Sequence, residues 1–139
     1  MDIAGRITPA WEVYASYMWL PVATIDKGVA GSEGQGTRPS LTPEHSGTVW
    51  TTWQMTPRLR VGAGVNLRSS QTPIRNPGWA VPGFVTGDLM AEYQLIQRQL
   101  TLKFNVSNVS NKLYADALYT GHYIPGAGRL MQLTASWRY

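Results

Sequence analysis

The chain has 139 residues, of which 14% are charged, against about 25% in a typical soluble domain. Lys and Arg number 12 against 8 Asp and Glu, which gives a net charge of +4, and there is no cysteine. The apolar runs fall short of the ~20 residues that a membrane-spanning helix needs, and the basic residues are scattered along the chain. These features exclude a helical membrane span and a disulfide framework, and they argue against a nucleic-acid partner.

In chain order, apolar and polar residues alternate with a period of two, which is the pattern of strands that have one apolar and one polar face. The first such segment alternates Trp11, Val13, Ala15, Tyr17 and Trp19 with the residues between them. The same alternation predicts strands at 11–19, 48–55, 59–68, 85–95, 100–107 and 131–139. We therefore expect an all-β chain, an antiparallel meander of about six strands of roughly ten residues each.

The connections between these strands alternate in length. Residues 56–58 and 96–99 form short turns, whereas residues 22–44, 71–83 and 110–128 form long loops rich in Gly, Pro and Asn. Each long loop follows a strand, and the connections in between are short. In an antiparallel sheet the long loops should therefore gather at one end. Short turns at one end and long loops at the other are typical of outer-membrane β-barrels.

The residues on the two faces of the expected strands also favour an outer-membrane β-barrel. Leu and Val lie in mid-strand on the apolar face, and aromatic residues near the strand ends would form interfacial girdles. These aromatic residues are Trp11, Trp19, Tyr93, Trp137 and Tyr139. The opposite face carries charges that would be costly in a dry core but that suit a watered lumen. They are Glu12, Arg60, Arg68, Asp88, Glu92, Lys103 and Arg138.

Two alternatives remain open on the pattern alone. Six alternating strands also describe a soluble β-sandwich that serves as a binding module, with its polar faces outside. A small complete barrel of about eight strands is the other possibility. The apolar face separates the first alternative from a membrane barrel, because a sandwich would cover that face with a second sheet.

Several ordered motifs resemble the C-terminal end of TonB-dependent outer-membrane receptors. The stretch 105–114 reads NVSNVSNKLY, the stretch 124–129 reads IPGAGR, and a strand that ends on an aromatic residue follows. Further matches lie upstream at 42–50, 59–64 and 81–88. Residues 68–73 and 76–79 look most like the catecholate siderophore receptors within that family.

This resemblance implies a fold and a function. Receptors of the family are barrels of about 22 strands with a plugged lumen, and they take up ferric siderophores across the outer membrane. Residues 1–139 would be a C-terminal portion of that barrel, without plug domain or signal peptide, and are not expected to transport alone. The implied partners are a ferric siderophore, outer-membrane lipid, the barrel-assembly machinery and, through the missing N-terminal part, the energy-transducing TonB system.

The resemblance also suggests where a ligand would bind. Ferric catecholates are anionic, so cationic and aromatic residues near the long loops are the candidates. They are Arg68, Arg75, Trp79, Tyr119, His122, Tyr123 and Arg129. An arginine at this position could instead pair with a loop carboxylate such as Asp116.

Trp137 and Tyr139 resemble the C-terminal signal for barrel assembly, although Phe is commoner than Tyr at its end. Iron stays inside its siderophore, so the sequence predicts no protein metal site and no cofactor. No arrangement of Ser, His and Asp indicates catalysis, so an enzyme is not expected.

Overall fold

The computed structural model describes residues 1–27, 34–73, 78–96 and 99–139. Over these ranges the chain forms strands joined by turns and loops, and no helix long and apolar enough to cross a membrane is found there. The strands are β1 (Asp2–Thr8), β2 (Trp11–Trp19), β3 (His45–Thr56), β4 (Leu59–Arg68), β5 (Phe84–Ile96), β6 (Leu100–Ser107), β7 (Ala115–Tyr119), β8 (His122–Pro125) and β9 (Leu130–Trp137).

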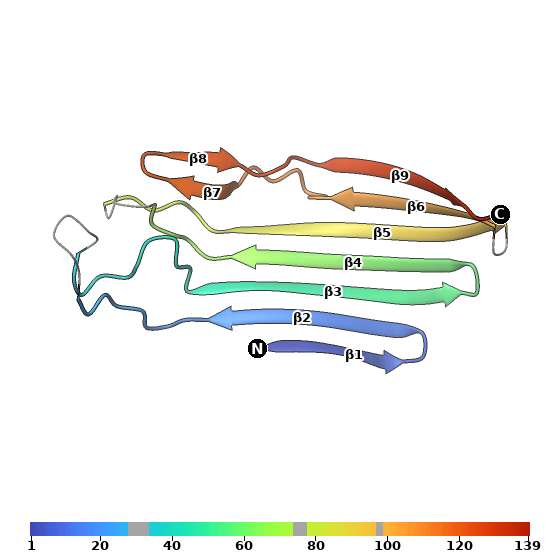
Figure 1. Ribbon diagram of the computed structural model, residues 1–139, viewed down its shortest axis with the longest axis horizontal. Coiled ribbons are helices and arrows are strands. Elements are labelled where there is room, and N and C mark those ends of the chain that lie inside the picture. Colours follow the sequence, from blue (N-terminus) through green and yellow to red (C-terminus); the bar gives the residue numbers. More distant parts are fainter. Residues whose placement is uncertain (28–33, 74–77, 97–98) are drawn as a thin grey trace.

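Seven strands form one antiparallel sheet in the order β1-β2-β3-β4-β5-β6-β9, and β7 and β8 form a separate hairpin between β6 and β9 (Figure 1). Long connections and the hairpin gather at one end of the sheet, and short turns lie at the other end, together with the C-terminus. We call these the loop end and the turn end. Strands β1 and β9 are outer edges that do not pair with each other, so the described strands do not close a barrel.

The register places the apolar residues of neighbouring strands directly opposite one another on one face. Val49 pairs with Val65, and Ala63 with Leu89. Further along the sheet, Phe104 pairs with Leu133. Residues opposite each other in an antiparallel pair share a face, so the predicted alternation is confirmed across the sheet. We call this surface the apolar face and its reverse the polar face.

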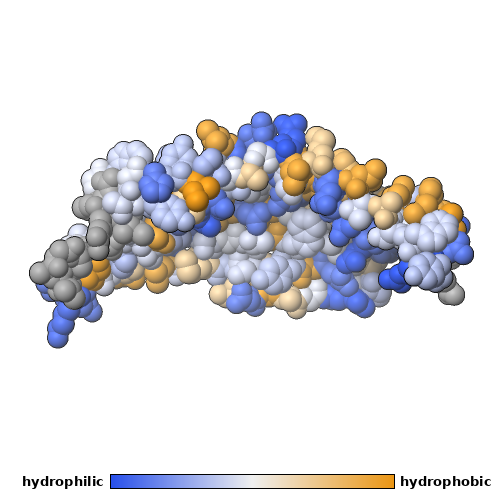
Figure 2. Space-filling model, turned by 45° about the horizontal axis from the view of Figure 1, so that its top comes forward, coloured by the Kyte–Doolittle hydropathy of each residue, from blue (hydrophilic) through white to orange (hydrophobic). Residues whose placement is uncertain are grey.

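The apolar face is exposed. Leu89 is 49% and Leu133 is 68% accessible, and hydrophobic side chains lie open on the surface in Figure 2. Strand contacts within the described part of the chain join only neighbours in the sheet order and the two strands of the hairpin. The β-sandwich alternative is therefore wrong, because no second sheet of described residues covers the apolar face.

The polar face carries its own interactions. The Glu12 carboxylate accepts hydrogen bonds from Arg6 and Arg60, each at 2.9 Å, and so bridges β1, β2 and β4. Next to this triad, the Trp50 ring lies against Gly64, where a Cβ atom would overlap the ring. Glycine at 64 thus allows a large aromatic ring to lie flat on the sheet.

The structure has more strands than the sequence pattern predicted. The pattern did not predict strand β1, because Ala4 and Gly5 at its centre give little contrast between the two faces. Hairpin β7–β8 was missed because its strands are only five and four residues long and lie inside a stretch rich in turn residues. Strand β9 ends at Trp137, so Tyr139 lies beyond the strand rather than on it.

Candidate functional site

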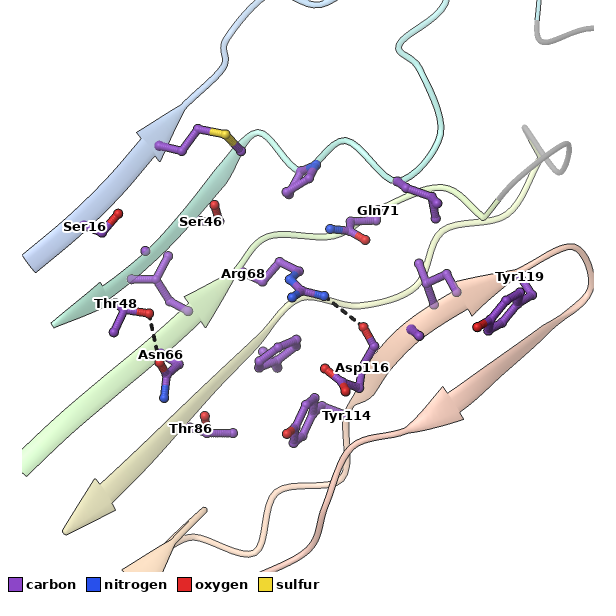
Figure 3. A pocket seen from close by; sticks show the side chains of 18 residues that line it. Ser16, Ser46, Thr48, Asn66, Arg68, Gln71, Thr86, Tyr114, Asp116 and Tyr119 are labelled. Carbon is purple, nitrogen blue, oxygen red and sulfur yellow. Dashed lines mark hydrogen bonds between the residues drawn. The ribbon is translucent and has the colours of Figure 1, made fainter. Parts of the chain in front are cut away.

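A cavity opens on the polar face at the loop end of the sheet, between the strands and hairpin β7–β8. It has a volume of about 880 Å³, and we call it the mouth pocket (Figure 3). Strands β2, β3, β4 and β5 supply its floor, and the hairpin supplies one wall. Its polar lining residues are Ser16, Ser46, Thr48, Asn66, Arg68, Gln71, Thr86, Tyr114, Asp116 and Tyr119.

Arg68 is the cation of the mouth pocket. It ends β4, opposite Ser46 of β3 and Phe84 of β5, which places its side chain on the polar face. Its guanidinium carbon lies 5.4 Å from the centre of the Phe84 ring, within the range of a cation–π contact. Its Nη1 donates a hydrogen bond of 3.0 Å to the backbone carbonyl oxygen of Asp116 in β7.

Among the residues that the structure describes, no carboxylate forms an ion pair with Arg68. The ion pairs found within the described ranges join Arg6 and Arg60 to Glu12 and His45 to Glu44, and Arg68 takes part in none of them. The expected alternative, a pair between Arg68 and the Asp116 carboxylate, is therefore wrong: the contact goes to the Asp116 carbonyl oxygen. An uncompensated guanidinium at the rim of a pocket favours an anionic ligand.

Aromatic rings continue from Arg68 toward the hairpin. The Phe84 and Tyr114 ring centres lie 4.3 Å apart at an interplanar angle of 33°. Tyr114 in turn packs against Gly126, whose backbone N–H donates to the Tyr114 carbonyl oxygen at 2.9 Å. A Cβ atom at Gly126 would overlap the Tyr114 ring. The absence of a side chain at Gly126 therefore allows the ring to lie beside Phe84.

The floor of the mouth pocket is neutral and rich in hydroxyl groups. Ser16, Ser46, Thr48, Asn66 and Thr86 reach it from four strands because each lies on the polar face (Figure 3). Thr48 donates a hydrogen bond of 2.9 Å to the Asn66 amide oxygen. These groups can donate and accept hydrogen bonds, which suits a ligand with several oxygen atoms.

The structure brings only some of the predicted site residues together. Arg68 and Tyr119 line the mouth pocket, and His122 stacks on Tyr119 with ring centres 5.0 Å apart. Trp79 and Tyr123 line a separate pocket of about 290 Å³ beside Lys112.

The backbone N–H of Arg129 donates to the Asn111 amide oxygen at 2.9 Å, but Arg129 lines neither pocket. Arg75 lies outside the described residues.

Sequence reasoning missed Phe84, Tyr114 and Asn66 as pocket residues. Asn66 could have been predicted, because it lies two residues before Arg68 on the same strand and therefore on the same face. Phe84 and Tyr114 gave no such signal, because their contact depends on how the loop after β6 returns to the sheet. Within the described ranges, no group of three or more His, Cys, Asp or Glu residues could hold a metal ion.

An antiparallel sheet with one exposed apolar face, one charged face and all long loops at one end is a segment of a β-barrel wall. Residues 1–109 match the family model described as TonB dependent receptor-like, beta-barrel. The chain belongs to this family.

Relatives extend the match over the whole chain. The chain is 34% identical to the probable TonB-dependent receptor BfrD of Bordetella pertussis, with 100% of this chain and 20% of BfrD aligned. It is 31% identical to the catecholate siderophore receptor Fiu of Escherichia coli K12, with 100% of this chain and 19% of Fiu aligned. The chain thus spans about a fifth of the length of these relatives.

A solved structure agrees with the fold. The crystal structure of the siderophore receptor PiuA from Acinetobacter baumannii superposes with a TM-score of 0.83 at 26% identity. The superposition covers 99% of this chain and 21% of PiuA. The seven-stranded sheet is therefore similar to part of the barrel of a siderophore receptor.

Proposed function

We propose that this chain is part of a bacterial outer-membrane receptor that takes up ferric siderophores, and that the ligand is of the catecholate class. The observation that carries the proposal is Arg68, a cation at the rim of the mouth pocket that pairs with no carboxylate of the described residues. Two relatives, PiuA and Fiu, are named as a siderophore receptor and a catecholate siderophore receptor. The proposal extends to the segment itself, residues 1–139, as a C-terminal portion of the barrel.

The chemistry of the pocket fits an iron(III) catecholate. Such a complex presents aromatic edges and carries negative charge on its oxygen atoms. The guanidinium of Arg68 would attract that charge, and the rings of Phe84 and Tyr114 beside it would contact the catechol rings. Hydroxyl and amide groups on the floor, such as Thr48 and Asn66, would bind oxygen atoms that do not coordinate iron.

The remaining partners belong to the same proposal. The apolar face would contact outer-membrane lipid, since its exposed Leu, Val and aromatic residues suit hydrocarbon. Trp137 and Tyr139 would be recognised by the barrel-assembly machinery. The TonB system would act through a part of the receptor other than these residues. Iron would remain cargo inside the siderophore, so the receptor is a transporter rather than an enzyme.

The test is a comparison of two ferric ligands that differ in charge. The protein is purified in detergent, and its tryptophan fluorescence is titrated with iron(III) tris-catecholate and with a neutral iron(III) tris-hydroxamate. We expect saturable quenching with the anionic catecholate and weaker binding of the neutral complex. Equal binding of both complexes would contradict the catecholate assignment, and binding of neither would contradict the receptor assignment.

A further inference from the structure

A continuous chain of hydrogen bonds crosses the polar face and ends at the base of hairpin β7–β8. Thr48 of β3 donates to the Asn66 amide oxygen of β4 at 2.9 Å, and the Asn66 amide nitrogen donates to Asp88 Oδ2 of β5 at 2.9 Å. The other oxygen of that carboxylate, Oδ1, accepts from the backbone N–H of Asn108 at 2.8 Å. Thr48 and Asn66 line the mouth pocket, so the chain begins at the proposed ligand site.

The Asn108 side chain holds both ends of the hairpin segment. Its Oδ1 accepts from the backbone N–H of Lys112 at 2.8 Å, and its Nδ2 donates to the carbonyl oxygens of Lys112 at 2.8 Å and Ala127 at 3.0 Å. Lys112 precedes β7 and Ala127 follows β8. One buried amide, with Asn108 only 4% accessible, therefore joins the two ends of the hairpin segment. The Gly126 N–H to the Tyr114 carbonyl oxygen and the Arg129 N–H to the Asn111 amide oxygen cross the same base.

Asparagine fits this position for two separate reasons. The backbone at Asn108 has φ of +49°, a left-handed conformation that Asn tolerates better than most residues. The three side-chain bonds also need one acceptor and two donors on a short side chain, which the carboxylate of Asp and the hydroxyl of Ser do not provide. Conformation and bonding thus require the same residue.

We propose that Asn108 is a positioning residue that holds hairpin β7–β8 as a preformed wall of the mouth pocket, with Asp88 as its anchor on the sheet. The role in ligand binding rests on the proposed function, whereas the anchoring of the hairpin does not. The hairpin carries Asp116 and Tyr119 into the pocket, and Tyr114 directly before it packs on Phe84. A wall that is ordered before the ligand arrives avoids the entropy cost of ordering these side chains on binding.

Among the contacts that hold the hairpin to the sheet, two side-chain anchors differ in position. Arg68 contacts it from the pocket side through the Asp116 carbonyl oxygen, where a ligand would compete for the guanidinium. Asn108 and Asp88 hold its base away from that cation. We therefore expect the contacts of Asn108 and Asp88 to keep the hairpin in place when Arg68 leaves the Asp116 carbonyl oxygen to bind an anion.

The experiment reports on the hairpin without any ligand. The chain contains no cysteine, so Thr120→Cys at the hairpin turn provides a nitroxide site in the full protein in detergent. Label mobility is measured by electron paramagnetic resonance with Asn108→Ala, Asp88→Ala and the control Asn105→Ala. Asn105 lies three residues upstream on β6 and has no side-chain hydrogen bond within the described ranges. We expect both Asn108→Ala and Asp88→Ala to mobilise the label, and Asn105→Ala to leave it unchanged.

The second measurement is affinity for iron(III) tris-catecholate, with circular dichroism to verify that the sheet is intact. We expect the dissociation constant to rise about tenfold in Asn108→Ala and to stay constant in Asn105→Ala. The conservative variant Asp88→Asn keeps an acceptor for the Asn108 N–H and should retain most of the affinity. If Asn108→Ala does not fold, the label mobility and affinity of Asp88→Ala test the proposal instead.

Each result has a distinct meaning. An immobile label in both Asn108→Ala and Asp88→Ala overturns the anchoring, whatever the ligand does. A mobile label with unchanged affinity overturns the positioning role. If the unmodified protein fails to bind the iron complex, the proposed function fails, while the label still decides whether Asn108 anchors the hairpin.

Discussion

Arg68 lies over the ring of Phe84, with its guanidinium carbon 5.4 Å from the ring centre, although the two residues are separated by the whole loop between β4 and β5. They meet because they are opposite residues in the β4–β5 ladder. The ring presents its negative face to the cation. Within the described ranges the guanidinium donates one hydrogen bond, to the Asp116 carbonyl oxygen.

Arg68 is expected to contribute to the affinity for an anionic ligand. Replacing it by Ala should raise the dissociation constant for iron(III) tris-catecholate about tenfold or more, because a charge-assisted hydrogen bond is lost. Arg68→Lys keeps the charge but loses the planar contact with Phe84, so we expect an intermediate loss. The control is Arg58→Ala, which removes an exposed arginine at the turn end. Equal losses at both positions would show a non-specific charge effect.

The Glu12 triad should stabilise the sheet only modestly. Both partner arginines and Glu12 itself are more than one-third exposed, so Glu12→Gln should lower the free energy of unfolding by about 1 kcal/mol or less. The difference should shrink when salt is raised, since the charges left on Arg6 and Arg60 are then screened. Urea titrations in detergent at two salt concentrations measure it. Glu92→Gln on the same face, which removes no ion pair seen in the described ranges, should have a smaller effect.

Gly64 should not tolerate a side chain. A Cβ atom there overlaps the Trp50 ring, so Gly64→Ala should displace the ring and cost about 1–3 kcal/mol in unfolding free energy. Near-ultraviolet circular dichroism and urea titration follow the change. At Gly87 the same atom would meet the Gly64 carbonyl oxygen at 3.7 Å, an ordinary contact, so Gly87→Ala is the matched control. Comparable losses in both variants would argue against a specific clash.

The apolar face should reject charge in a bilayer. Leu89→Arg places a guanidinium in the middle of that face and should cost about 2–4 kcal/mol if the position lies near the bilayer midplane. The measurement is the fraction of protein that binds lipid vesicles across a urea series. Thr134→Arg on the polar face is the control and should bind like the parent. If the two variants bind equally well, the apolar face does not contact lipid.

These 139 residues alone should not form a pore. Strands β1 and β9 are unpaired edges of the described sheet, and hydrocarbon cannot satisfy their free N–H and C=O groups. We expect no ion conductance across a planar bilayer and no heat-dependent shift in gel mobility after refolding. A monomer that shows both properties would contradict this prediction.

The sequence predicted those strands in which apolar and polar residues alternate. Successive strands such as 59–68 and 85–95 alternate with few exceptions, such as Met90 on the polar face, so their faces could be assigned, and the observed register agrees. Hairpin β7–β8 could not be found in this way, because its strands are too short for a period of two to emerge. The mouth pocket was only partly predictable for a related reason. The place of Arg68 on the polar face could be predicted from the alternation along its strand. The packing of Tyr114 on Phe84 could not, because it depends on the path of the loop, which Gly126 and Asn108 fix.

The two-faced register has a consequence for assembly. A strand that pairs one residue out of step turns every side chain to the opposite face, so Glu12 or Arg60 would enter the lipid and the leucines would enter the lumen. Such a mispaired sheet is far less soluble in the bilayer than the correct one. A lipid environment would therefore favour the native register over slipped ones during folding.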